Sequence, residues 1–96
     1  MLVEIENSST LADNLLTFPC PLEIKALGRK KSGFESQICT IIDRHLNGEP
    51  ILCTRSRSSR QGRYISVTCV IKAFDREQLN AIYLDLNREP DVLMVF

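Results

Sequence analysis

The stretch Tyr64-Ile-Ser-Val-Thr-Cys-Val-Ile-Lys-Ala73 alternates in character along its whole length. One face collects Ile65, Val67, Cys69, Ile71 and Ala73, and the other collects Tyr64, Ser66, Thr68, Val70 and Lys72. A period of two over so long a stretch indicates a half-buried β-strand. Because one face is apolar throughout, we expect this strand to lie in the centre of a sheet and helices to cover that face.

Three shorter segments are also predicted to be strands. Residues 22–27 alternate in the same way, and Gly28 is expected to end this strand. Residues 51–57 alternate less cleanly and end in charged side chains, which suits the edge of a sheet. Residues 58–62 are the predicted turn into the long strand, and residues 92–96 are a final short strand after Pro90.

Two segments between these strands have helical periodicity. The first is expected to begin after an N-cap at Ser32 and to end at Asn47-Gly48. Its core-facing residues are Phe34, Ile38, Ile41, Ile42 and Leu46. The second is expected to begin after Asp75, with Gln78 at the capping-box position. Its core-facing residues are Leu79, Ile82, Tyr83 and Leu86, so both helices are predicted to pack on the sheet.

The predicted order is strand, helix, strand, strand, helix, strand. With right-handed crossovers this order gives an α+β fold of the ferredoxin-like βαββαβ type, a four-stranded antiparallel sheet in the order 4-1-3-2 with two helices on one face. The long strand then lies between the first and the second. The opposite face carries Glu23, Lys25, Ser66, Thr68, Val70 and Lys72. The sequence leaves open whether this face meets water, the N-terminal segment or a second subunit.

The N-terminal part is expected to be organised separately. Residues 1–9 have few apolar anchors and are predicted to form a flexible leader. Thr10 reads as the N-cap of a short additional helix, which Phe18-Pro-Cys-Pro21 ends. Residues 10–96 are therefore expected to form one ferredoxin-like domain.

Composition excludes several classes of function. Twelve acidic and twelve basic residues cancel, so no overall field directs the chain to nucleic acid or to a membrane. The charge is uneven, however: residues 1–24 carry four acids and no base, whereas residues 25–63 carry nine bases and three acids. The sequence has neither a membrane-spanning window nor the pattern of a signal peptide. The four cysteines lack metal-site spacing, so we expect free thiols, no metal and a cytoplasmic location.

The sharpest functional feature is the segment 55–63, in which Arg55, Arg57, Arg60 and Arg63 alternate with serines and a glycine. A planar guanidinium fits phosphate or carboxylate, so this hairpin predicts a site for an anion or an acidic partner. The alternative is a solvated hairpin tip. A second basic loop, formed by Arg29, Lys30 and Lys31, precedes the first helix, where backbone amides can also attract an anion.

Two other functions occur on this fold. Acylphosphatase-like enzymes bind phosphate in the loop before the first helix, but Gly28-Arg-Lys-Lys-Ser-Gly-Phe34 lacks their tight backbone cradle. RNA-recognition domains stack bases on aromatic side chains of the first and third strands, where this chain has only Tyr64. Arginine contacts to RNA would then be non-specific. His45 has no matched nucleophile and is expected to be a cap or a surface contact.

Four segments resemble the YbeD-like family of small bacterial proteins. They are Phe18-Pro-Cys-Pro-Leu-Glu-Ile-Lys-Ala-Leu-Gly28, Arg44-His45, Ser58-Ser-Arg-Gln-Gly-Arg-Tyr-Ile-Ser-Val-Thr68 and Val92-Leu-Met-Val-Phe96. The chain departs from the family pattern by an extra residue before Gly62 and by a longer, acidic leader. The resemblance implies a fold akin to the ACT regulatory domains and a link to lipoate or amino-acid metabolism, and it supplies no catalytic residue.

These observations favour a non-enzymatic, ACT-like regulatory or binding module that needs no cofactor. We expect it to hold an anionic small molecule or an acidic protein partner, and to form a homodimer, if it forms one, through the open sheet face or an edge strand. The candidate binding residues are Lys25, Arg29, Lys30, Lys31, Arg44, His45, Arg55, Arg57, Ser59, Arg60, Gly62, Arg63, Tyr64 and Ser66. Among these, Gly62 is expected to supply a turn position with positive φ.

Overall fold

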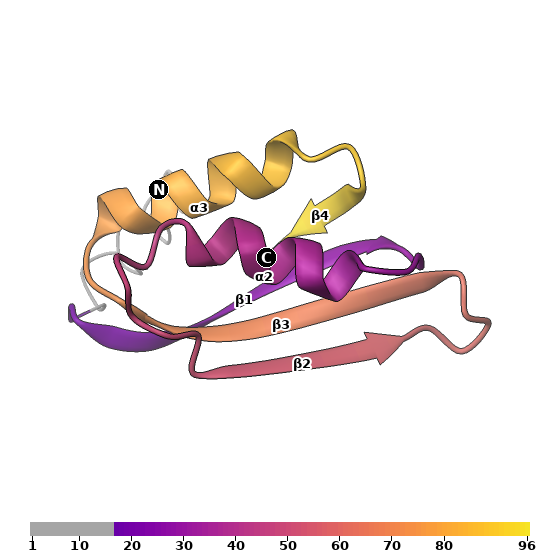
Figure 1. Cartoon of the computed structure of the whole chain (residues 1–96), viewed down its shortest axis with the longest axis horizontal. Coiled ribbons are helices and arrows are strands. Elements are labelled where there is room, and N and C mark those ends of the chain that lie inside the picture. The colour runs from indigo at the N-terminus through magenta and orange to yellow at the C-terminus, as the bar shows by residue number, and fades with distance from the viewer. Residues whose placement is uncertain (1–16) are drawn as a thin grey trace, which may run out of the picture.

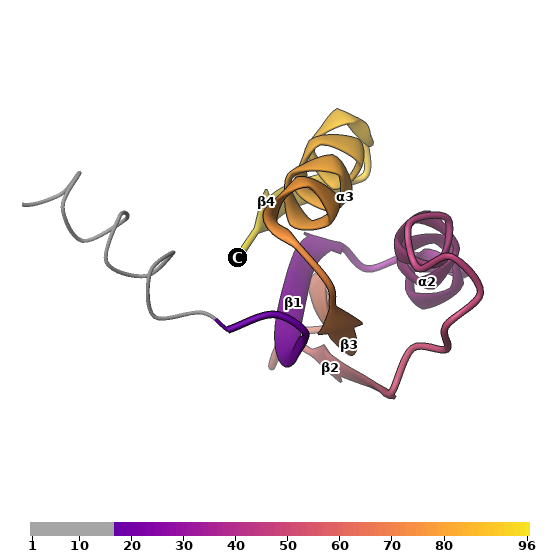
Figure 2. The same cartoon turned by 90° about the vertical axis from the view of Figure 1, so that its left-hand side faces the viewer.

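The computed structural model describes residues 17–96, which form six elements in the predicted order. The elements are β1 (Cys20–Arg29), α2 (Phe34–Asp43), β2 (Cys53–Ser58), β3 (Tyr64–Ala73), α3 (Arg76–Arg88) and β4 (Val92–Val95). Figures 1 and 2 show both helices on the same side of one sheet. The predicted leader at residues 1–9 and the predicted helix that begins at Thr10 lie outside the described residues.

The sheet confirms the predicted strand order and the central position of the long strand. Its order is β2-β3-β1-β4, which is 4-1-3-2 read from the other edge. β3 pairs antiparallel with β1, so that Ile24 lies opposite Cys69 and Ala26 lies opposite Val67. β2 pairs with the other side of β3 and forms one edge of the sheet, as the charged end of its sequence predicted.

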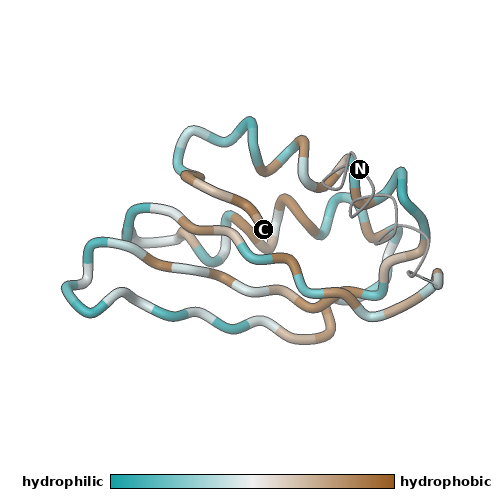
Figure 3. The backbone as a smooth tube through the Cα atoms, turned by 180° about the vertical axis from the view of Figure 1, so that it is seen from behind, coloured by the Kyte–Doolittle hydropathy of each residue, from teal (hydrophilic) through white to brown (hydrophobic). Residues whose placement is uncertain are grey.

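The core lies between the sheet and the inner faces of the two helices. The helix-facing side chains of β3 at positions 67, 69, 71 and 73 are all 0% exposed, which confirms the side predicted from the alternation. The rest of the buried core consists of Ile24, Ala26, Phe34, Ile38, Ile41, Ile42, Leu46, Leu79, Ile82 and Leu86. Figure 3 views the sheet from behind and shows β2 as largely hydrophilic, beside more hydrophobic β1 and β3.

The start of α2 differs from the prediction. Its N-cap is Gly33 rather than Ser32, and no side chain caps the helix with a hydrogen bond. Gly33 has φ of 85°, a left-handed conformation that glycine adopts without the steric cost of a Cβ. The prediction was wrong because Gly33, in a left-handed turn, occupies the position directly before the helix and leaves Ser32 one residue too early to be the cap.

The end of α2 also differs. The helix ends at Asp43 with Arg44 as its C-cap, before the predicted stop at Asn47-Gly48. Leu46 is nevertheless buried, so it reaches the core from the turn that follows the helix. Asn47 and Gly48 both have positive φ, at 54° and 88°, and redirect the chain towards β2.

Gly28 does not end the first strand, as the sequence suggested, but lies inside it. β1 continues to Arg29, and Gly28 lies opposite Ile65 on the helix-facing side. A Cβ at this position would lie 2.5 Å from two ring atoms of Phe34 and 2.6 Å from the Asp91 carbonyl oxygen. The glycine is therefore required by close packing, which single-sequence patterns do not reveal.

The start of α3 confirms the predicted cap and adds a link to the other helix. The Asp75 carboxylate accepts a hydrogen bond from the Gln78 backbone N–H at 2.8 Å. The Gln78 side chain accepts from the Phe74 N–H at 2.7 Å and donates to the His45 carbonyl at 2.8 Å. One glutamine thus caps α3 and ties it to the chain that leaves α2.

Candidate functional site

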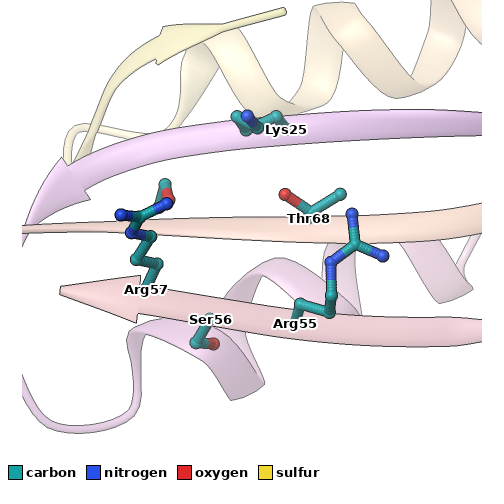
Figure 4. A pocket seen from close by; sticks show the side chains of 6 residues that line it. Lys25, Arg55, Ser56, Arg57 and Thr68 are labelled. Carbon is teal, nitrogen blue, oxygen red and sulfur yellow. The ribbon is translucent and has the colours of Figure 1, made fainter.

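The face of the sheet away from the helices contains a hollow of about 380 Å³, which we call the open-face groove. Its lining residues come from the three neighbouring strands β1, β3 and β2, and they are Lys25, Ser66, Thr68, Arg55, Ser56 and Arg57. The strand register places them in two adjacent rows across the sheet, Arg55–Thr68–Lys25 and Arg57–Ser66–Leu27. Figure 4 shows both arginines extending over β3, whereas Ser56 points to the other side of β2. The arrangement groups three cations around two hydroxyls.

The charges in this groove are only partly compensated. The Arg55 guanidinium donates to the Glu23 carboxylate at 3.0 Å, across β3. This hydrogen bond is the main reason why the pKa of Arg55 is raised above its ordinary value. The equivalent diagonal position for Arg57 is occupied by Lys25, a like charge. Arg57 has no ion-pair partner among residues 17–96, so the groove keeps an excess of positive charge.

The hollow continues along β2 and β3 towards the hairpin between them. Arg57 and Ser66 also line a second hollow of about 160 Å³, which Tyr64 and Ser59 share. The same tyrosine and serine line a third hollow of about 210 Å³ with the hairpin residues Arg60, Gln61 and Arg63. The basic hairpin therefore adjoins the groove instead of standing apart from it.

Two of the predicted residues in this hairpin shape the turn. The Ser59 hydroxyl accepts hydrogen bonds from the Arg63 N–H at 3.2 Å and from the Tyr64 N–H at 3.1 Å. Gly62 has φ of 74°, as its place in the turn predicted. Both residues fix the conformation of the turn from which Arg60 and Arg63 project. They would therefore contribute to a binding site by positioning these two arginines.

The basic loop before α2 lies at the same end of the sheet as the hairpin. The Lys30 N–H donates to the Arg63 carbonyl at 2.8 Å, which joins the loop to the hairpin. The Lys31 ammonium donates to the Asp91 carboxylate at 2.7 Å and lowers the pKa of that group. Arg29 lies opposite Tyr64 in the pairing of β1 with β3. The loop thus adds the charge of Arg29 and Lys30 to this end, whereas the charge of Lys31 is compensated.

Arg44 and His45 lie elsewhere, at the end of α2 in the helix layer. The His45 Nε2 lies 2.7 Å from the Asp85 carboxylate of α3, and the Arg44 guanidinium lies 3.9 Å from the same group. The hydrogen bond with His45 lowers the pKa of Asp85 below its ordinary value of 3.8. The pair ties the two helices together, and the structure does not bring it to the groove.

Sequence reasoning missed one groove residue and a neighbouring aromatic side chain. Thr68 lies between Arg55 and Lys25 and is only 5% exposed, although its face is open. Phe96 follows β4, exchanges two backbone hydrogen bonds with Lys25, and has its ring centroid 5.5 Å from the Lys25 ammonium. The alternation places Thr68 on the open face, but its central position depends on the register between strands.

The cysteines of residues 17–96 form no disulfide, and the possible metal ligands in this range form no metal-binding cluster. Cys20, Cys39, Cys53 and Cys69 are all free thiols. Within residues 17–96, no three histidine, cysteine or acidic side chains lie close enough to hold a metal ion. Over the same range, no helix has the length and apolar character needed to cross a membrane.

Two solved structures share this architecture. The ACT domain from the GTP pyrophosphokinase of Chlorobium tepidum superposes with a TM-score of 0.65 at 17% identity, over 80% of this chain and 83% of that domain. Protein HP0495 from H. pylori superposes with a TM-score of 0.67 at 12% identity, over 84% of this chain and 85% of that protein. Since both identities are low, the likeness is one of fold: the chain is an ACT-like, ferredoxin-like domain.

Sequence comparison gives the family. Residues 13–96 match the model of the family described as "Protein of unknown function (DUF493)", and the chain belongs to that family. A UPF0250 protein of Azotobacter vinelandii is 40% identical over 81 residues, which are 83% of this chain and 88% of that protein. The UPF0250 protein NE1487 of Nitrosomonas europaea is 34% identical over 83 residues, or 86% and 95% of the two chains. These relatives bear out the resemblance to the YbeD-like family found in the sequence.

Proposed function

We propose that the chain is a non-enzymatic binding module whose open-face groove holds a small molecule with a phosphate or carboxylate group. The observation that carries this proposal is the convergence of Lys25, Arg55 and Arg57 on two hydroxyl groups, with Arg57 unpaired among residues 17–96. Guanidinium and ammonium groups bind such anions through charge-assisted hydrogen bonds. Because three paired strands fix the backbone from which these side chains project, binding requires little further ordering of the backbone.

The dimensions of the groove favour a small molecule over an acidic protein surface. Its volume of about 380 Å³ falls within the usual range for ligand sites, roughly 300–1,000 Å³. The side chains that line it are of types that bind and orient an anion without any transfer of a proton. A regulatory role of the ACT kind, and a link to lipoate or amino-acid metabolism, are expectations from the family resemblance and guide the choice of ligands to test.

The test compares two variants that lose the same charge in different places. Arg57→Gln removes the unpaired guanidinium of the groove, and Arg88→Gln removes an exposed arginine of α3 in the helix layer. Binding of inorganic pyrophosphate and of lipoate is measured by calorimetry at low salt. We expect at least one of them to bind the wild type and Arg88→Gln alike, and to bind Arg57→Gln about tenfold more weakly.

Two results would overturn the proposal. One is equal affinity of Arg57→Gln and Arg88→Gln, because binding would then be non-specific attraction. The other is tighter binding of a single-stranded oligouridine than of either small anion, with an affinity that falls steeply with salt. That result would assign the basic hairpin end to RNA.

A further inference from the structure

The free edge of β2 is an unoccupied position for another strand. β2 pairs with β3 on one side only, and no strand of residues 17–96 covers its other side. The Ser59 N–H donates to the Tyr64 carbonyl at 2.8 Å, and hydrogen-bonded pairs alternate along an antiparallel ladder. The backbone N–H and C=O groups of Thr54, Ser56 and Ser58 therefore point to the free edge. Such an edge readily pairs with an added strand.

The side chains beside this edge specify what kind of strand fits. On the open face, Arg55 and Arg57 project two residues apart. On the helix side, a groove of about 470 Å³ runs between α2 and the chain that leads into β2, and Cys39 and Ile51 are among its lining residues. A matching strand would place acids at every second position towards the arginines, and apolar side chains between them towards the helix groove.

A second copy of β2 does not meet this requirement. In a symmetric antiparallel pair, Arg55 of one copy would lie beside Arg57 of the other, and both such contacts would be repulsive. Like charges directly opposite each other destabilise paired strands. The expectation of a homodimer through this edge is therefore disfavoured by the charge of β2 itself.

We infer that the free edge of β2 is the docking site for residues 3–6 of the same chain, Val3-Glu4-Ile5-Glu6, added as an antiparallel strand. This segment alternates acidic and apolar residues with the required spacing, and it lies in the part of the chain that carries no base. Antiparallel pairing sets Glu4 beside Arg57 and Glu6 beside Arg55. Ile5 then falls on the helix side, towards the groove between α2 and β2.

The length of the connecting chain permits this pairing. An antiparallel segment would end at the same end of the sheet as the start of β1, where residue 17 begins the described chain. The added strand would lie three strand spacings from β1, or about 14 Å. Residues 7–16 reach roughly 33 Å when extended. They still reach about 20 Å if residues 10–16 are helical, as predicted from the sequence.

Competition with a ligand is a consequence that rests on the proposed function. Residues 3–6 would contact Arg55 and Arg57, the same arginines that line the open-face groove, so they would compete with an anionic ligand. Removal of the two acids should then tighten binding of pyrophosphate, whereas docking of the segment itself needs no ligand and is measured without one.

The test uses the full chain, labelled for NMR, in the absence of ligand. We expect nuclear Overhauser contacts between Ile5 and Ser56, and slowed amide exchange at Ser56 and Ser58. Glu4→Lys/Glu6→Lys should remove both signals, and Arg55→Glu/Arg57→Glu should remove them too. The combination of all four changes should restore them, because the charges are exchanged rather than lost.

Glu49→Lys/Glu77→Lys makes the same change of charge at two exposed acids that do not line the helix-side groove, and it should leave the signals intact. Amide exchange at β2 that is the same in Glu4→Lys/Glu6→Lys and in the wild type would overturn the inference. So would protection that rises with protein concentration, since a second copy would then cover the edge, and so would failure of the fourfold variant to restore the contacts.

Discussion

Arg55 of β2 and Glu23 of β1 form an ion pair at 3.0 Å across the central strand β3. The pair spans the open face without any contribution from the helix layer. Arg57 lies two residues further along β2 and has the same diagonal relationship to Lys25 of β1. Its neighbour across β3 is therefore a base instead of an acid. One end of the groove is therefore neutralised within the protein, and the other end is left to attract an anion from outside.

This difference predicts the effect of removing the internal acid. Glu23→Gln should strengthen binding of pyrophosphate about two- to fivefold, because Arg55 is released from a competing carboxylate. Calorimetry at low ionic strength measures the change, with Glu49→Gln as the control for overall charge. The same gain in both variants would show that only net charge matters and would argue against a defined groove.

Close packing at Gly28 predicts a second result. Gly28→Ala should lower the free energy of unfolding by about 1–3 kcal/mol, because its Cβ would overlap the Phe34 ring and the Asp91 carbonyl. Gly62→Ala, which meets no atom within 4 Å but has φ of 74°, should cost about 1 kcal/mol through its backbone alone. Urea unfolding compares the two variants. A Gly28→Ala protein as stable as the wild type would refute the packing argument.

The contact between His45 and Asp85 predicts a dependence of stability on pH. The hydrogen bond lowers the pKa of Asp85 in the folded state, so its contribution is present above the ordinary value of 3.8 and is lost as the pH falls through the lowered value. Asp85→Asn should therefore be less stable than the wild type at about pH 6, and the difference should shrink towards zero below the ordinary value.

Urea unfolding over this pH range provides the measurement. Asp43→Asn is the matched control, since Asp43 is exposed at the end of α2 and forms no ion pair among residues 17–96. A loss of stability in Asp85→Asn that is the same at every pH would mean that packing, rather than the ionised carboxylate, joins the two helices.

The cysteines should differ widely in reactivity. Burial raises the pKa of the Cys69 thiol to about 12, and the side chain is 0% exposed, whereas Cys53 is exposed on β2. Because the thiolate is the reactive form, iodoacetamide at pH 8 should label Cys53 first and Cys69 only after unfolding in urea. Peptide mapping by mass spectrometry follows both sites. Labelling of both at similar rates in the native protein would contradict the placement of Cys69 in the core.

The fold could be predicted from the sequence because each strand and helix carries its own periodic pattern. The alternation over residues 64–73 identifies the central strand and its buried face without knowledge of any partner. The errors occurred where tertiary contacts decide the outcome. Gly28 resembles a strand end in the sequence, because the approach of the Phe34 ring cannot be read from the sequence.

The candidate site was less accessible to prediction for the same reason. The arginines at positions 55 and 57 stand out as a local cluster, but Lys25 and Thr68 join them only through the register of three strands. His45 and Asp85 are forty residues apart, so the sequence contained no sign of their contact.

The most direct test of the central claim is an NMR titration of the labelled full chain with inorganic pyrophosphate. We expect saturable shifts of the backbone amides at Lys25, Arg57, Ser66 and Thr68, which Arg57→Gln removes and Arg88→Gln retains. Shifts confined to the loop at residues 29–33, or no saturable shift at millimolar pyrophosphate, would contradict the claim.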